Sequence, residues 1–260
     1  AIIVKDDAII VKDDVVQVDN ESFVLVKDNW LYFEKLTKEQ QAAFTAGKVA
    51  TQLGDAQALS DFIEKGKRLF KIHAVDKFGA NLLHFAAVSG QKNTLDVLIK
   101  HNLDVNHLNI YGWNIFHQAA TWGHSDVIEY LLDTLEPKTS AQLLRTKEFK
   151  TSQTPLHFAA TSGSEKAVKA LLTFAEQHLD QNYINTQDKQ GRTPLHLATS
   201  QSHTGVIDLL VAASANTTVR DKFGRGPLPR KANTVMPLST VSTTKSSSIK
   251  QSTTKSSSIK

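Results

Sequence analysis

Residues 151–163 read TSQTPLHFAATSG and residues 191–200 read GRTPLHLATS, so one short pattern occurs twice. Two weaker copies precede them, GANLLHFAAVSG at 79–90 and GWNIFHQAATWG at 112–123, and DKFGRGPLPR at 221–230 is a truncated further copy. The aligned histidines, separated by 33, 40 and 39 residues, are His84, His117, His157 and His196. A recurring period near 33 residues predicts a repeat architecture.

Each part of the pattern suits a pair of helices. Pro155 fits the first helical turn, where its missing N–H has no partner to lose. Thr154 stands just before it, where a hydroxyl can cap the helix. Gly163 then ends this short helix, because glycine enters the left-handed conformation without penalty. A second helix follows, with apolar residues at helical spacing, as in AVKALL at 167–172.

A period of 33 with Thr-Pro-Leu-His and Ala-Ala resembles the ankyrin repeat over about residues 46–229, with about five repeats, several degenerate. The resemblance implies an all-α fold class, an ankyrin-repeat solenoid of stacked helix pairs with β-turn fingers. The ankyrin-repeat domain is expected over 37–229. Its parts are a degenerate cap at 37–75, repeats from about 76, 109, 149 and 188, and the truncated copy at 221–229.

The ends of the chain differ from the repeats. Residues 15–28 alternate in polarity around a turn and predict a small β-hairpin within an N-terminal segment of residues 1–36. Thr37 and Gln40 match a capping box at the start of the first helix pair. Residues 230–260 are a low-complexity basic segment without aromatic residues, which predicts a disordered C-terminal tail.

Some repeats depart from the pattern. Ser152 and Ser202 stand where glycines are expected, at a turn and at the end of a helix. Extra residues follow Leu132 and Leu172. Pro137 makes the first insertion a loop followed by a short helix, and residues 171–179 predict that the second insertion lengthens a helix.

The net charge of +4 is unevenly distributed. Residues 1–45 carry five lysines against nine acidic residues, a net charge of −4. Residues 230–260 carry six basic residues and no acidic one, which leaves +2 for residues 46–229. The basic balance therefore belongs mostly to the tail, and binding of nucleic acid or an anionic surface through that tail is only a weak alternative.

Composition and motifs exclude several classes of site. No apolar run approaches the ~18 residues of a membrane span, so no membrane insertion is expected. The absence of cysteine excludes disulfides, thiolate zinc sites and cysteine nucleophiles. Phosphate-binding glycine loops and nucleophile elbows are also missing. We therefore expect no enzyme, no catalytic residue, no cofactor and no small-molecule substrate.

The repeat histidines do not form a metal site. Stacked helices lie ~8–10 Å apart, whereas zinc needs ligands at ~2 Å, so histidines of successive repeats cannot share one ion. The resemblance implies instead that each histidine hydrogen-bonds the backbone between neighbouring turns. No metal ligand is expected.

The resemblance implies that finger tips and the exposed ends of the first helices bind other proteins. Aromatic residues at such positions indicate an interaction patch, because tryptophan and tyrosine are enriched at binding hot spots. The alternative is that Trp113 or Trp122 packs against a neighbouring repeat or the 133–150 insertion. The candidate partner-binding residues are Phe78, Tyr111, Trp113, Trp122, Lys77, Arg192, Phe223 and Arg225.

The expected function is a non-catalytic protein–protein interaction module, an adaptor or scaffold for a protein partner of unknown identity. One alternative is the recognition part of a larger enzyme, since the chain begins at Ala1 and its only methionine is Met236, as in a processed chain or part of a longer one. Another follows from the degenerate repeats, which resemble those of bacterial effectors acting on host proteins. A cytoplasmic location is expected, or the host cytosol for an effector.

Overall fold

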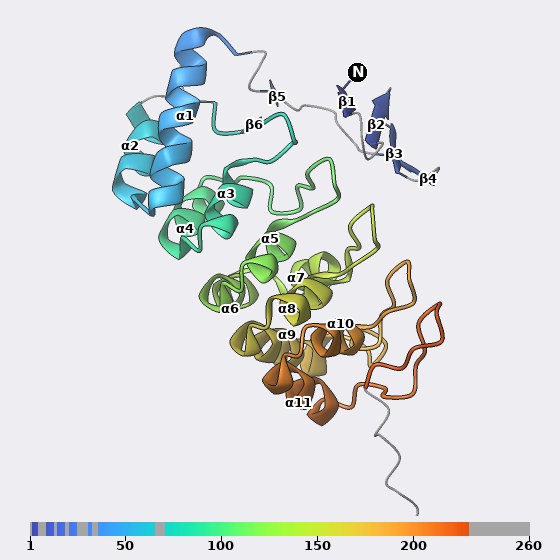
Figure 1. The fold of residues 1–260 in the computed structure, drawn as a ribbon. Coiled ribbons are helices and arrows are strands. Elements are labelled where there is room, and N and C mark those ends of the chain that lie inside the picture. The colour runs from blue at the N-terminus through green and yellow to red at the C-terminus, as the bar shows by residue number, and fades with distance from the viewer. Residues whose placement is uncertain are drawn as a thin grey trace, which may run out of the picture. The chain divides into compact units, whose positions relative to one another are not determined.

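The computed structural model describes residues 36–65 and 71–228 in full, and the backbone of five short strands within the first 32 residues. Helices dominate this part of the chain, and most of them form helix–turn–helix pairs (Figure 1). The pairs are α1 (Lys38–Leu53) with α2 (Ala56–Lys65), α3 (Leu82–Val88) with α4 (Lys92–Lys100), α5 (Ile115–Thr121) with α6 (Ser125–Thr134), α8 (Pro155–Ser162) with α9 (Glu165–His178), and α10 (Pro194–Ser200) with α11 (Thr204–Ala212).

The helix pairs stack in sequence order. The first helices contact one another in the order α1, α3, α5, α8 and α10, and the second helices in the order α2, α4, α6, α9 and α11. Between the pairs, turns that we call fingers project from the same side of the stack (Figure 1). The fingers are residues 76–80, 109–113, 148–153, 188–192 and 221–225. The predicted all-α solenoid of stacked helix pairs is therefore confirmed.

The core runs through the stack without interruption. Equivalent side chains of the first helices, such as Leu83, Phe116 and Leu156, have no exposed surface. Their small neighbours Ala119 and Ala160 are equally buried. Small residues let successive first helices approach closely, so each repeat buries its apolar face against the next.

The insertions form the predicted elements. α7 (Pro137–Arg145) begins at the proline and lies between α6 and α8 in the chain, and α9 extends to His178. The two serines take the conformation of the glycines they replace, with φ of 59° at Ser152 and 61° at Ser202.

The N-terminal strands form an antiparallel sheet in the order β1 (Ile2–Val4), β2 (Ile9–Lys12), β3 (Val15–Val18) and β4 (Glu21–Val24). Pairing of β3 with β4 is the expected hairpin, and β1 and β2 were not predicted. β5 (Leu31–Tyr32) pairs in parallel with β6 (Ala74–Val75), just before the first finger. The disorder expected for residues 230–260 concerns residues outside the described part of the chain.

A buried histidine links each repeat to the next finger. The Nε2 atoms lie 3.0–3.2 Å from the carbonyl oxygen of the last residue of that finger. The four pairs are His84 with Trp113, His117 with Gln153, His157 with Arg192, and His196 with Arg225. The implied structural role of these histidines is therefore confirmed.

The repeats with Thr-Pro also define the histidine tautomer. The amide of Thr154 donates to Nδ1 of His157 at 3.2 Å, and the hydroxyl lies 2.9 Å from the same atom. Because Nδ1 accepts, the proton sits on Nε2 and is donated to the next finger. The threonine hydroxyl that we expected to cap the helix therefore also orients the histidine.

Burial keeps these imidazoles neutral. It lowers the pKa of His84 and of His117 to about 3, and that of His157 to about 4. A second proton would place a positive charge in the low-dielectric core, and in His157 it would also remove the Nδ1 acceptor of the Thr154 amide. Protonation is therefore compatible with the unfolded chain and not with the stack.

We predict that the free energy of unfolding is highest above about pH 6.5, where the histidines of the unfolded chain are neutral. It should fall as the pH drops from this value towards the pKa values of the folded state. The loss should approach ~1.4 kcal/mol per pH unit for each such histidine. Urea unfolding between pH 7 and pH 4.5 measures it. His157→Gln should flatten the pH dependence, whereas His73→Gln, at an exposed position, should not. An unchanged slope in His157→Gln would contradict the assignment.

Candidate functional site

Each finger is closed by the side chain of its own first residue. In four fingers, an oxygen of Asp76, Asn109, Asp188 or Asp221 accepts the backbone N–H groups two and four residues later, at 2.8–3.0 Å. The remaining finger is one residue longer, and the longer side chain of Glu148 accepts from its backbone N–H groups. An Asx-type turn of this kind holds the tip residues in a fixed orientation.

Neighbouring fingers are joined by backbone hydrogen bonds. Ile110 N–H donates to the carbonyl of Phe78 at 3.0 Å, and Phe149 N–H donates to that of Tyr111 at 2.9 Å. The later fingers repeat this bond, with Lys189 donating to Thr151 and Lys222 to Gln190. The finger tips therefore form one row in constant register.

Aromatic side chains from three successive repeats line a groove of about 580 Å³ along this row. We call it the aromatic groove and define it by Phe78, Phe85, Tyr111, Trp113 and Phe158. The ring centroids of Phe78 and Tyr111 lie 6.1 Å apart, and those of Trp113 and Phe158 lie 4.7 Å apart. The structure thus brings three of the predicted site residues together.

Trp113 packs against a neighbouring repeat, which was one alternative for this residue, and still lines the groove. Its ring packs on Phe158 of the following repeat, and it also lines the aromatic groove. Gly112 allows this arrangement, because its φ is 76° and an added Cβ would lie 2.7 Å from the Phe149 ring. The groove wall is therefore also a contact between repeats.

The sequence prediction missed Phe85 and Phe158. Both directly follow a repeat histidine, in the identical tripeptide Leu-His-Phe at 83–85 and 156–158, and both are half-buried. Lys48 lies with its Nζ atom 3.8 Å from the centroid of Phe85. The prediction covered only the finger tips and the ends of the first helices. The phenylalanine that recurs directly after the histidine is the sequence signal for these two residues.

Trp122 does not line the groove. It caps the C-terminus of α5 and is 62% exposed. Gln118, which does line the groove, lies four residues before it, and Trp122 N–H donates to the Gln118 carbonyl at 3.4 Å. Residues four apart share a helix face, so Trp122 lies on the same side of α5 as Gln118, one turn further along.

The other predicted residues lie in different fingers. Lys77 has its Nζ atom 4.8 Å from the centroid of Phe78, at the edge of the groove. Arg192 and Arg225 bind the aspartates of their own fingers at 2.8 and 2.7 Å. Phe223 is 69% exposed in the last finger and lies outside the groove lining.

Charge along the fingers differs between their interior and their surface. The carboxylates of Glu148, Asp188 and Asp221 are buried inside their turns. Burial favours the neutral form of Asp188, but hydrogen bonds from Arg192 and Gln153 outweigh it and hold its pKa below the ordinary value. Lys77, Lys150 and Lys222, in contrast, are exposed. The accessible charge of the finger row is therefore mainly positive.

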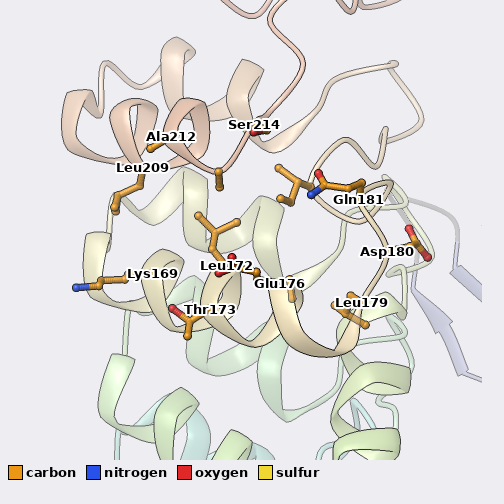
Figure 2. Close-up of a pocket in the computed structure, with 13 residues that line it drawn as sticks. Lys169, Leu172, Thr173, Glu176, Leu179, Asp180, Gln181, Leu209, Ala212 and Ser214 are labelled. Carbon is orange, nitrogen blue, oxygen red and sulfur yellow. The ribbon is translucent and has the colours of Figure 1, made fainter.

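A second cavity, of about 330 Å³, lies between α9 and α11 (Figure 2). The extension of α9 contributes much of its lining, including Glu176 and Leu179. In Figure 2, Leu172 rises from α9 into the gap beneath α11, whereas Lys169 extends outward. Its lining holds aliphatic but no aromatic side chains, in contrast to the aromatic groove.

Two further kinds of site, a metal site and a membrane-spanning helix, were sought in the described residues. Across residues 36–65 and 71–228, no three histidine or acidic side chains are grouped so that they could hold a metal ion. Within the same ranges, no helix is both long and apolar enough to cross a bilayer.

We predict that Asp188→Ala lowers the free energy of unfolding by about 2 kcal/mol, because two backbone N–H groups and Arg192 lose a buried acceptor. Asp188→Asn should cost less, since Asn109 closes its own finger with the same geometry. Urea unfolding at pH 7 compares the two variants. Equal losses in both would show that the ion pair, and not the turn, carries the stability.

Comparison with known proteins agrees with this architecture. The family model for ankyrin repeats (3 copies) matches residues 48–142 and 137–221, which together exceed half of the chain. Rabankyrin-5 of Mus musculus is 40% identical over 82 residues, which are 31% of this chain and 6% of that protein. Inversin of Homo sapiens is 29% identical over 204 residues, 76% of this chain and 18% of that protein.

A third relative is the E3 ubiquitin-protein ligase XBAT33 of Arabidopsis thaliana, 27% identical over 157 residues, 52% of this chain and 29% of that protein. The chain thus spans less than a third of the length of each of these relatives. Ankyrin repeats are protein–protein interaction modules. The helix pairs, the fingers, the histidine links and the family match lead to one conclusion: this chain belongs to the ankyrin-repeat family.

Proposed function

We propose that this chain is a non-catalytic adaptor or scaffold that binds a protein partner through its finger tips and the concave face of its first helices. The aromatic groove is the observation that carries the proposal. Five aromatic side chains from three repeats line it, and Phe78 at its edge remains 37% exposed. Aromatic rings left accessible on adjoining elements mark interaction surfaces and supply hot spots there.

The use of the histidines supports the non-catalytic part of the proposal. The Nε2 atoms of all four repeat histidines lie within hydrogen-bond distance of backbone carbonyls, and burial keeps at least three of these rings neutral. They therefore hold the stack together and are not placed to exchange protons with a substrate. The cytoplasmic location expected from the cysteine-free sequence remains part of the proposal.

A second candidate is the recognition part of a longer enzyme. One relative is an E3 ubiquitin-protein ligase, and this chain matches 29% of that protein. In such an enzyme the repeats would select the protein that a separate catalytic domain modifies. The groove would then have the same role, with a different consequence for the bound partner.

We predict that Tyr111→Ser combined with Trp122→Ser abolishes selective capture of partner proteins from a lysate by the immobilised full chain. The pair removes one ring from the groove and one from the following turn of α5, so loss of ≥ ~2 kcal/mol of binding free energy is expected. Quantitative mass spectrometry of the captured proteins measures the change.

The matched control is Leu53→Ser, because Leu53 is apolar and 74% exposed at the end of α1 but does not line the groove. Circular dichroism verifies that both variants keep their helices. Proteins retained by the wild type and by Leu53→Ser but not by the double variant would support the site. Identical captured sets in all three would contradict it.

A further inference from the structure

The aromatic groove is larger than one side chain needs. Its volume of about 580 Å³ falls within the ~300–1,000 Å³ of pockets that enclose whole small ligands. It is open along the finger row, since its lining comes from the fingers at 76–80, 109–113 and 148–153 as well as from the first helices. A short stretch of chain with a bulky apolar side chain fits this combination of size and openness.

A second apolar contact lies close to the groove. Trp122 follows Gln118 by one helical turn, which is ~5.4 Å along the axis of α5. Side chains two residues apart on an extended strand are ~6.6 Å apart and point to the same side. Apolar residues at positions i and i+2 of a linear segment can therefore contact the groove and Trp122 together.

The accessible charge around the groove favours an acidic segment. Lys150 lines the groove and Lys77 lies beside Phe78 at its edge, both with exposed side chains, and the Nζ atom of Lys48 lies over the Phe85 ring. Two carboxylates also line the groove, the half-buried Asp76 and the buried Glu148, and both accept backbone N–H groups of their own fingers. Potentials of opposite sign across an interface orient a partner and speed its association.

We infer that the aromatic groove binds a linear acidic segment of the partner protein, which places one bulky apolar residue in the groove and a second on Trp122, with aspartate or glutamate beside them. This inference rests on the proposed function and specifies the partner's chemistry. Single-stranded nucleic acid also offers negative charge and rings that stack. The middle finger of the groove, residues 109–113, carries no lysine, so Lys77 and Lys150 do not form the continuous basic track that a phosphate backbone needs.

The test is selection of random 12-residue peptides displayed on phage against the immobilised full chain in 50 mM NaCl. Recovered peptides should share two apolar residues at i and i+2 with an adjacent aspartate or glutamate. Fluorescence polarisation of a synthetic recovered peptide then gives the affinity. Tyr111→Ser should weaken it about 30-fold, as expected for a hot spot.

The role of charge is tested with the double variant Lys77→Glu and Lys150→Glu, which should lower the affinity for the same peptide about tenfold. Raising the NaCl concentration to 500 mM should lower the affinity of the wild type several-fold. Lys138→Glu, Lys92→Glu and their pair make matched charge reversals on α7 and α4, outside the groove lining, and should change affinity less than twofold. Fluorescein-labelled dT15 in the same assay reports nucleic-acid binding.

The outcomes separate the two proposals. Peptides that depend on Tyr111 but lack acidic residues, or that ignore the lysine reversals, overturn the inference and leave the proposed function standing. Tighter binding of dT15 than of any peptide, or recovery of no peptide above background, also overturns it. Peptides whose affinity Tyr111→Ser leaves unchanged contradict the proposed binding site itself.

Discussion

The hydrogen bond from a buried histidine to the carbonyl of the next finger is the interaction on which the rest of the structure depends. It occurs at every junction from His84 to His196, over 3.0–3.2 Å. Each of these carbonyls also accepts the N–H of the first residue of its own finger, so the histidine adds the hydrogen bond that ties the finger to the repeat before it. Because burial keeps the imidazoles of His84, His117 and His157 neutral, these three links bury no charge. The histidine links therefore fix each finger relative to the repeat before it, from His84 to His196.

The binding surface is a consequence of this order. A turn-closing aspartate, asparagine or glutamate side chain fixes each finger internally, and one backbone hydrogen bond joins it to the neighbouring finger. Only then do rings from different repeats, such as Tyr111 and Phe158, reach the same groove. Most of the turn-closing carboxylates are buried inside the turns, whereas Lys77, Lys150 and Lys222 are exposed on the fingers. A single set of turn residues thus determines both the shape and the charge of the surface.

Much of the fold could be predicted from sequence, because the repeat pattern is local. The capping box of Thr37 and Gln40, the helix beginning at Pro137 and the lengthened α9 all follow from short-range signals. Strands β1 and β2 were missed because two identical apolar runs gave no sign of their pairing partners. Antiparallel partners are set by turns and by burial, and neither is visible in a short duplicated segment.

The site was predictable only in part. The tip residues Phe78, Tyr111 and Trp113 could be placed by their distance from the repeat histidine. Phe85 and Phe158 recur beside the histidine, but this signal does not give the direction of their side chains, which depends on the face of the short first helix that the neighbouring repeat covers. That Arg192 is bound by Asp188 was equally hidden, since the pairing arises only when the finger closes.

Trp113 connects three repeats at once. Its carbonyl accepts the hydrogen bond of His84 from the repeat before, its amide closes its own finger, and its ring packs on Phe158 of the repeat after. In a solenoid each repeat contacts only its neighbours, so neighbouring repeats can move relative to one another at each interface. A partner bound against Trp113 would contact residues of successive repeats and restrict motion at two of these interfaces, so binding at the groove would stiffen this part of the solenoid.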